Sequence, residues 1–135
     1  PGPRPNRCIF WNARLLSRVK AYTIESEVKH MADYESRLRA PDLDALFDAV
    51  LLLRDRSECY RFFEDVCTIS ELKSIAQRFD VAKKLDEGVT YQEISQQLGA
   101  STATISRVNR SLNYGNDGYE LVFGRMEKKE TEQNS

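Results

Sequence analysis

The sequence Tyr91-Gln-Glu-Ile-Ser-Gln-Gln-Leu-Gly-Ala-Ser-Thr-Ala-Thr-Ile-Ser-Arg107 decides the fold of this chain. It follows Thr90, which forms a capping-box pattern with Glu93 and thereby starts a short helix. Gly99 then permits a left-handed turn, and Ser101 is a favoured N-cap for a second helix. The side chains predicted to face the core are Ile94, Leu98, Ile105, Val108 and Leu112. Two short helices joined by such a tight turn are typical of a helix-turn-helix.

Burial of that stripe would turn small polar and methyl side chains outward near the start of the second helix. Such groups allow a helix to approach base edges closely in the major groove. The net charge of the chain is −1, so contact with phosphate needs a local face, and residues 101–116 hold two arginines and no carboxylate. We expect double-stranded DNA to contact Gln92, Ser101, Thr102, Ala103, Thr104, Ser106, Arg107 and Arg110. The alternative is a helical hairpin whose hydroxyls only face water.

Four further helices are predicted around this motif, and no segment alternates with a period of two over a useful length. A second capping box at Thr68–Glu71 starts a helix that stops at Gly88. Apolar spacing predicts earlier helices capped by Asp42 and starting after Ser57, and Asp117 is expected to cap the last one. The apolar stripe of the helix after Thr68 is Leu72, Ile75, Ala76, Phe79 and Ala82. The predicted fold class is all-α, with six helices.

The consecutive residues Leu51, Leu52 and Leu53 predict that the helix after Asp42 is apolar beyond one face. A helix that is apolar around much of its girth needs cover on two sides, and a domain this small offers little. We therefore expect a homodimer in which the partner subunit provides the cover.

The two ends of the chain differ in composition from the middle. Residues 1–30 hold six Lys or Arg and two Asp or Glu, with prolines at 1, 3 and 5. We interpret residues 1–30 as a basic leader that is outside the fold or non-native, with an arm touching DNA or a targeting segment as alternatives. The folded domain is expected over residues 31–126, starting at Met31. Residues 127–135 are almost wholly polar and are interpreted as a frayed tail.

Several classes of protein do not fit this composition. Cys8, Cys59 and Cys67 are irregularly spaced and His30 is the one histidine, which predicts no disulfide framework and no metal site. We expect Cys59 and Cys67 to be small buried hydrophobic residues. No paired nucleophile and base, ordered carboxylate cluster or phosphate-binding glycine loop is found, so we predict no catalytic residue and no enzyme. No apolar run of about 18 residues predicts a membrane span. The expected location is the cytoplasm, on the bacterial nucleoid when DNA is bound.

From Leu43 to Met126 the chain resembles the Trp-repressor-like proteins, and specifically their YerC/YecD branch. The strings that carry the resemblance are Thr68-Ile-Ser-Glu-Leu-Lys-Ser-Ile-Ala-Gln-Arg78, Gly99-Ala-Ser-Thr-Ala-Thr-Ile-Ser-Arg107 and Leu112-Asn-Tyr-Gly-Asn-Asp-Gly-Tyr119. The resemblance implies a transcription regulator that forms an intertwined helical homodimer. Each subunit's helix-turn-helix would enter one major groove of a palindromic operator.

The resemblance also implies a candidate effector pocket, in which two arginines would clamp the carboxylate and the indole of tryptophan. The residues that match its lining are Thr68, Arg78, Arg107 and Ser111. Val108 departs from the pattern, because the Trp repressor has a glycine there and a β-branched side chain would occupy volume that the indole needs. We therefore expect no cofactor, and DNA binding that does not require tryptophan.

Other interpretations remain open at this point. A helix-turn-helix-shaped module that binds proteins instead of DNA would show large apolar residues on the outward face of residues 101–110. The side chains found there are Thr102, Thr104, Ser106, Asn109 and Arg110. A replication initiator would add a nucleotide-binding segment, and we find none in the sequence. The alternative role of Arg78 and Arg107 is a phosphate contact or an ion pair between helices.

Overall fold

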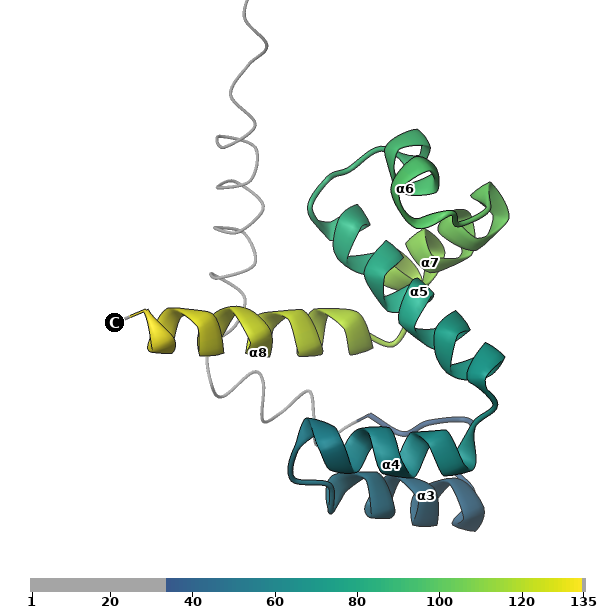
Figure 1. Cartoon of the computed structure of the whole chain (residues 1–135), viewed down its shortest axis with the longest axis vertical. Coiled ribbons are helices and arrows are strands. Elements are labelled where there is room, and N and C mark those ends of the chain that lie inside the picture. Colours follow the sequence, from purple (N-terminus) through teal and green to yellow (C-terminus); the bar gives the residue numbers. More distant parts are fainter. Residues whose placement is uncertain (1–33, 135) are drawn as a thin grey trace, which may run out of the picture. The chain divides into compact units, whose positions relative to one another are not determined.

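The computed structural model describes residues 34–134, and this range contains six helices and no strand. The helices are α3 (Pro41–Leu51), α4 (Arg56–Val66), α5 (Ile69–Asp86), α6 (Tyr91–Leu98), α7 (Thr102–Tyr114) and α8 (Gly118–Gln133) (Figure 1). The predicted all-α, six-helix class is confirmed for this part of the chain. The chain divides into two compact units between Leu52 and Leu53, with α3 in the first unit and α4 to α8 in the second. The predicted leader over residues 1–30, with Cys8 and His30, lies outside the described residues.

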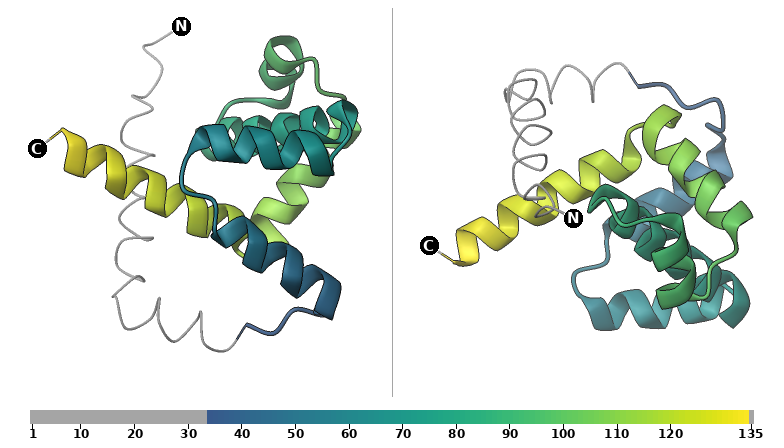
Figure 2. Two further views of the ribbon diagram at one scale, coloured as in Figure 1. Left: turned by 60° about the horizontal axis from the view of Figure 1, so that its bottom comes forward. Right: turned by 90° about the horizontal axis from the view of Figure 1, so that it is seen from above.

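The core of the second unit forms where α5, α6 and α7 meet, and each of these helices packs against the other two (Figure 1 and Figure 2). The buried side chains are Val81, Ala82, Ile94, Ala100, Ile105, Val108 and Phe123, of which Val81, Ala82, Ile94 and Ile105 have no exposed surface. Full burial of an aliphatic side chain of the size of Val or Ile stabilises a fold by about 1.5–3 kcal/mol. This one cluster therefore attaches both α6 and α7 to the second half of α5.

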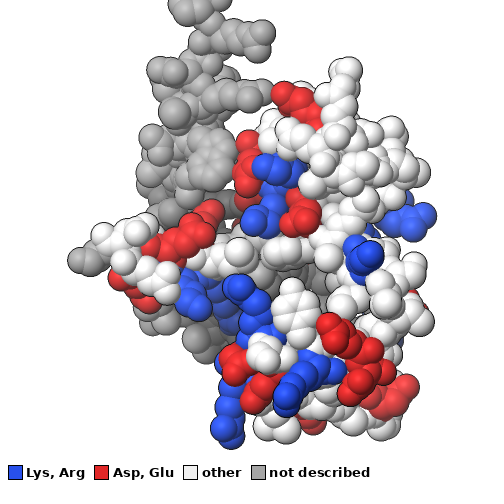
Figure 3. Space-filling model, viewed as in Figure 1, with Lys and Arg blue, Asp and Glu red and all other residues white. Residues whose placement is uncertain are grey.

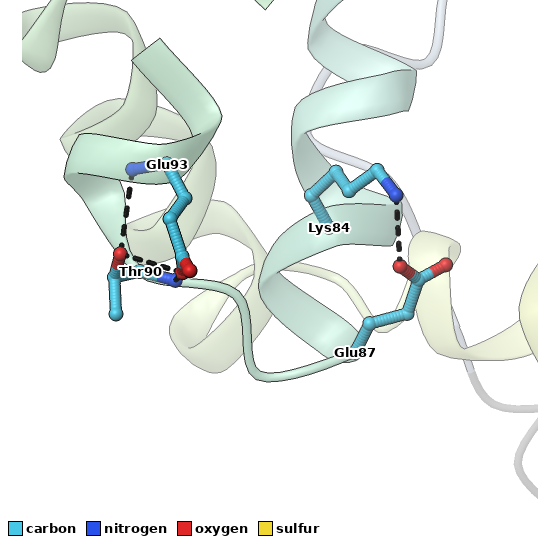
Figure 4. Close-up of polar contacts among 4 residues, drawn as sticks. All are labelled: Lys84, Glu87, Thr90 and Glu93. Atoms are coloured by element: carbon cyan, nitrogen blue, oxygen red, sulfur yellow. Dashed lines mark hydrogen bonds and ion pairs between the residues drawn. The ribbon is translucent and has the colours of Figure 1, made fainter. Parts of the chain in front are cut away.

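Capping boxes start α5 and α6, as the sequence predicts. At α6 the N–H of Glu93 donates to Thr90 Oγ1 at 3.3 Å, and the N–H of Thr90 donates to Glu93 Oε2 at 3.0 Å (Figure 4). Thr68 and Glu71 make the same pair of hydrogen bonds at α5. Each box satisfies backbone donors that have no partner inside the helix. These hydrogen bonds also lower the pKa of the Glu71 carboxyl, because they favour its charged form.

The turn between α5 and α6 is closed by local contacts at the C-terminus of α5. Gly88 adopts φ 78°, and the N–H of Val89 donates to the carbonyl of Lys84 at 3.0 Å. Lys84 Nζ also lies 3.2 Å from Glu87 Oε2 (Figure 4). A cation in the last turn of a helix interacts favourably with the exposed carbonyls there. The predicted stop at Gly88 is confirmed.

The two N-terminal helices begin at other residues than the sequence predicts. α3 begins at Pro41, and Asp42 lies inside its first turn instead of capping it. Proline is favoured at this position because the N–H that it lacks would have no partner there. Asp55 caps α4, since its carboxylate accepts the N–H of Glu58 at 2.9 Å. Ser57 is therefore a residue of the first turn of α4 and does not precede the helix.

The three consecutive leucines do not make α3 apolar on two sides, so that prediction is wrong. The helix ends at Leu51, and the N–H of Leu52 donates to the carbonyl of Ala49 at 3.1 Å, which closes the last turn. Leu53 lies beyond this turn, outside the helix. The side chains of Leu51 and Leu52 are nevertheless 81% and 77% exposed. Their exposure remains a feature of the surface that requires explanation.

The predicted apolar stripe of α5 is correct only for the second half of the helix. Ala82 is buried and Phe79 packs against the core, whereas Ile75 is 52% exposed. Val81 is fully buried although it is not part of the predicted stripe. The face of α5 that α6 and α7 cover is thus rotated toward Val81.

Aromatic side chains attach α8 to the core. The ring of Phe123 lies 5.6 Å from that of Phe79 and 5.9 Å from that of Tyr119, measured between centroids. Asp117 occupies the predicted N-cap position, but its φ is 59° and its side chain makes no capping hydrogen bond. The backbone of the turn, and not a side-chain cap, therefore starts this helix.

The last helix is longer than the sequence predicts. It continues to Gln133, although residues 127–133 were expected to be frayed. These residues are exposed, and the hydroxyl of Thr131 donates to the carbonyl of Glu127 at 2.9 Å. Glu, Lys and Gln have high helix propensity, which accounts for a helix that extends past its last buried contact.

Gly115 and Gly124 provide a matched pair of tests for the turn between α7 and α8. A Cβ at residue 115 would lie far inside the contact distance of the Ser111 carbonyl oxygen, whereas a Cβ at residue 124 meets no atom within 4 Å. Gly115→Ala is expected to destabilise the protein by about 1–3 kcal/mol through this clash. Gly124→Ala, within α8, is expected to stabilise it by about 0.5–1 kcal/mol. Urea unfolding of both variants measures the difference, and equal effects would contradict the close packing of this turn.

Candidate nucleic-acid interface

The turn of the helix-turn-helix is held by three adjacent residues with different roles. Gly99 adopts φ 62°, and its N–H donates to the carbonyl of Ser95 at 2.9 Å, which ends α6. Ala100 is 2% exposed and so attaches the turn to the core. Ser101 caps α7, because its Oγ accepts the N–H of Thr104 at 3.2 Å. The left-handed glycine and the serine cap that the sequence predicts are both confirmed.

The burial of Ile105 and Val108 determines which side of α7 faces outward. Of the residues predicted to contact DNA, only Thr104 is half-buried. The exposed ones are Gln92, Ser101, Thr102, Ala103, Ser106, Arg107 and Arg110. Except for Gln92, which lies at the start of α6, they lie between Ser101, the N-cap of α7, and Arg110. The structure therefore brings most of the predicted residues together on one short segment.

Thr104 differs from its neighbours because its hydroxyl already has a partner. Thr104 Oγ1 lies 3.0 Å from Ser101 Oγ, and either oxygen could donate in this hydrogen bond. The pair belongs to the N-cap of α7, so both hydroxyls have a structural role, and of the two residues only Ser101 is exposed. Thr102 is more exposed and stands one turn before Ser106 on the outward side. Thr102 is thus the better candidate for a side chain free to meet a ligand.

The surface of the motif has few charges, and those near α7 are positive. The first turn of α7 contains no acidic residue. Arg107 and Arg110 are both exposed, three residues apart on the helix. In Figure 3 the surface over α6 and α7 is mostly uncharged, with basic patches at its right edge and acidic patches at its left edge. An anion could therefore approach this end of α7 without meeting a carboxylate on the helix itself.

The predicted effector-pocket residues on α5 do not come together within one chain. Thr68 and Arg78 are ten residues apart in the sequence, which corresponds to about 15 Å along a helix. The Thr68 hydroxyl donates to Glu71 Oε2 at 2.8 Å, within the capping box. The guanidinium of Arg78 folds back on its own helix, where Nε and Nη2 each lie 3.3 Å from oxygens of Ser74. In this arrangement neither side chain points to a shared ligand.

The remaining pocket residues lie on α7 and are divided between its two sides. Arg107 and Ser111 are exposed, whereas Val108 is 2% exposed and belongs to the core cluster. The side chain of Val108 thus occupies interior volume, beside Ile105 on the same buried face. A glycine at this position would leave that volume empty.

One polar contact of the motif was not predicted from the sequence. Gln77 of α5 donates from Nε2 to the carbonyl oxygen of Leu98, at 3.2 Å, across the helix-turn-helix. Both residues are half-buried. Helical periodicity could not identify this contact, because a glutamine beside an apolar stripe is also the ordinary residue at the edge of a helix surface.

Other candidate chemistry finds little support in the described residues. Cys59 and Cys67 are free thiols that are half-buried, whereas the sequence predicts that they are buried. No group of three or more His, Cys, Asp or Glu side chains within residues 34–134 is arranged to hold a metal ion. Over the same range no helix has both the length and the apolar content to cross a bilayer.

Three relatives match most of this chain. The uncharacterized protein YerC from Bacillus subtilis (strain 168) is 57% identical over 99 residues, which cover 73% of this chain and 95% of YerC. The crystal structure of a proposed Trp repressor from Staphylococcus aureus has a TM-score of 0.65 and 55% identity, covering 67% of this chain and 91% of that one. A TrpR-like protein from Eubacterium eligens ATCC 27750 has a TM-score of 0.66 and 59% identity, covering 68% and 95% of the two chains.

The family model of the Trp repressor protein matches residues 41–127, which is more than half of the chain. This range agrees with the resemblance seen in the sequence from Leu43 to Met126, and it contains all six described helices except the end of α8. The matching family is one of regulators and not of enzymes. The chain belongs to the Trp repressor protein family.

Proposed function

We propose that this protein is a sequence-specific transcription regulator, most simply a repressor, that binds double-stranded DNA through α6 and α7. In this proposal α7 enters the major groove of an operator, and a dimer of the chain reads a palindromic site. The protein would act in the cytoplasm, on the nucleoid. Binding would block the access of other proteins to the same DNA.

The observation that carries the proposal is the division of α7 into a buried side and a small polar side. Ile105 and Val108 hold the helix against the core, while Thr102, Ala103 and Ser106 are exposed. Hydroxyl and methyl groups of this size can hydrogen-bond base edges or touch the thymine methyl group without holding the backbone away. A module that binds proteins through this face would instead carry large apolar side chains.

The arginines would supply the electrostatic part of binding. Arg110 is exposed on α7, two turns beyond Thr102, where it would reach phosphate and not base edges. The N-terminal N–H groups of α7 add a partial positive charge near the same DNA strand. Because the whole chain has a net charge of −1, these local groups would have to outweigh a weak overall repulsion.

Thr102→Ala and Arg110→Ala separate base reading from phosphate contact. Selection of bound duplexes by the full chain first gives the preferred site. Thr102→Ala is expected to reduce discrimination at particular base pairs by about 1–3 kcal/mol. Arg110→Ala is expected to weaken all sequences alike and to reduce the slope of log K against log [salt] by about one unit. Binding isotherms across a salt series measure both effects. A chain that selects no duplex would refute the proposal, and an Arg110→Ala variant with altered preference would refute the assigned roles.

The homodimer in this proposal is supported by the exposure of apolar side chains in the first helices. Within the described part of the chain, no residue of α3 or α4 is buried. Phe47 of α3 is 58% exposed and Ile69, the first residue of α5, is 75% exposed. Exposed apolar surface on this scale usually marks an interaction site. A second copy of the chain would cover it most simply, because the family implies an intertwined dimer.

Phe47→Glu tests the homodimer, with Ala45→Glu as its control on the polar side of α3. Phe47 lies in the apolar stripe of the helix, whereas Ala45 lies near the opposite side. Sedimentation equilibrium is expected to show a dimer at micromolar concentration for the natural chain and for Ala45→Glu. Phe47→Glu should weaken dimerisation by at least about 2 kcal/mol, as expected for a buried aromatic anchor. A folded monomer formed by the natural chain would contradict the proposed dimer.

We further propose that tryptophan is not required for DNA binding. Val108 fills core volume where the Trp repressor has a glycine, and adding atoms to a packed site typically costs about 1–3 kcal/mol. The Thr68 hydroxyl and the Arg78 guanidinium are engaged within α5. An indole would therefore have to displace existing contacts as well as find space.

Titration calorimetry with tryptophan measures this directly. No saturable heat is expected up to about 1 mM ligand, because an overpacking cost of that size weakens binding by about one to two orders of magnitude. The affinity for the selected duplex should also be the same with and without tryptophan. Saturable binding at micromolar concentration, together with tighter DNA binding, would return the chain to a tryptophan-dependent mechanism.

A further inference from the structure

The contact between Gln77 and Leu98 joins two elements that are otherwise held together by apolar packing. Gln77 lies in α5 and Leu98 is the last residue of α6, 21 positions later. Nε2 of Gln77 donates to the Leu98 carbonyl oxygen at 3.2 Å in a half-buried setting. The acceptor thus belongs to the residue directly before the left-handed Gly99 of the turn.

The Leu98 carbonyl needs a partner from outside its own helix. The last four carbonyls of an α-helix have no N–H partner within the helix, and α6 has only eight residues. The N–H of Gly99 donates to the carbonyl of Ser95. The side-chain amide of Gln77 donates to the carbonyl of Leu98. This hydrogen bond lies in a half-buried place, where water has limited access to the carbonyl.

Hydrogen-bond geometry gives this contact a role that apolar burial does not have. Ile94 and Ala100 attach α6 and the turn to the core, but apolar contact is non-directional and permits small rotations. A hydrogen bond weakens steeply when its angle changes. The Gln77 amide therefore restrains the end of α6, and α7 starts only a few residues later, at Thr102.

We propose that Gln77 is a positioning residue, which fixes the turn against α5 and thereby the angle at which α7 meets DNA. The effect of Gln77 on DNA binding rests on the proposed function, whereas its effect on the turn does not. Gln77 itself touches no base in this scheme. Its loss should reduce discrimination between duplexes more than it reduces the affinity for any duplex.

Three variants test the proposal. Gln77→Met has a similar shape and no donor, and Gln77→Lys keeps an N–H donor at comparable reach. Gln133→Met makes the same chemical change at the exposed end of α8, far along the chain from the turn, and serves as the control. Hydrogen exchange of the amides in α6 and at Gly99 reports on the turn without DNA. The ratio of the affinities for the selected duplex and for a random duplex reports on the angle of α7.

In Gln77→Met we expect amide exchange at α6 and Gly99 to become about fivefold faster and the affinity ratio to fall about tenfold. The salt slope should remain that of the natural chain, because no phosphate contact is lost. Gln77→Lys should restore slow exchange, and Gln133→Met should change neither readout. Unchanged exchange in Gln77→Met would overturn the proposal, and so would an equal loss of affinity for both duplexes. If the natural chain prefers no duplex, the proposed function fails, and the exchange rates alone still decide the role of Gln77 in the turn.

Discussion

The structure depends above all on the burial of one side of α6 and α7 against the second half of α5. Val81 and Ala82 provide the surface on α5, and Ile94, Ile105 and Val108 pack on it without exposure to water. α6 has eight residues and α7 has thirteen, and isolated helices shorter than about 12–15 residues are marginal in water. Their existence is therefore a consequence of this packing. The same packing decides which side chains of α7 are exposed, so the fold and the proposed reading surface have one physical cause.

The capping boxes and the left-handed glycine could be predicted from the sequence because each depends on contacts within a few residues. Thr68 and Thr90 meet the glutamates three positions later, and Gly99 takes the φ that its missing side chain allows. The features that could not be predicted depend on which neighbour covers a helix. Periodicity marks Ile75 as apolar, but the positions of α6 and α7 determine that Val81 is buried and Ile75 is exposed. The exposure of most residues predicted to contact DNA could be predicted, because it depends only on which side of α7 is buried. The apolar residues Ile105 and Val108 mark that side in the sequence.

The two halves of the described chain differ in how far they complete their own packing. All buried side chains in the described part of the chain come after residue 80. The apolar side chains of α3 and α4 are either exposed or half-buried. The three consecutive leucines do not lie in one helix, because α3 ends at Leu51. The side chain of Leu51 is nevertheless exposed. α3 carries an apolar stripe that is flanked by Asp44 and Asp48, which is the pattern of a helix that packs against a single surface. This one-sided stripe, and not a helix that is apolar on two sides, is the observation that supports the proposed homodimer.

Val108 belongs both to the buried core and to the set of residues predicted to line an effector pocket. A glycine at the position of Val108 would leave space on the buried side of α7. A bound ligand could fill that space and complete the packing of the core. Here the valine completes it from within the chain, next to Ile105 and opposite Val81 and Ala82 in one cluster. In the proposed function, Val108 packs α7 against the core without a ligand, and a ligand would change DNA binding only if it bound one state of the protein more tightly than another. The turn at Gly99, which the hydrogen bond from Gln77 to Leu98 restrains, would then be a fixed element of the proposed reading surface.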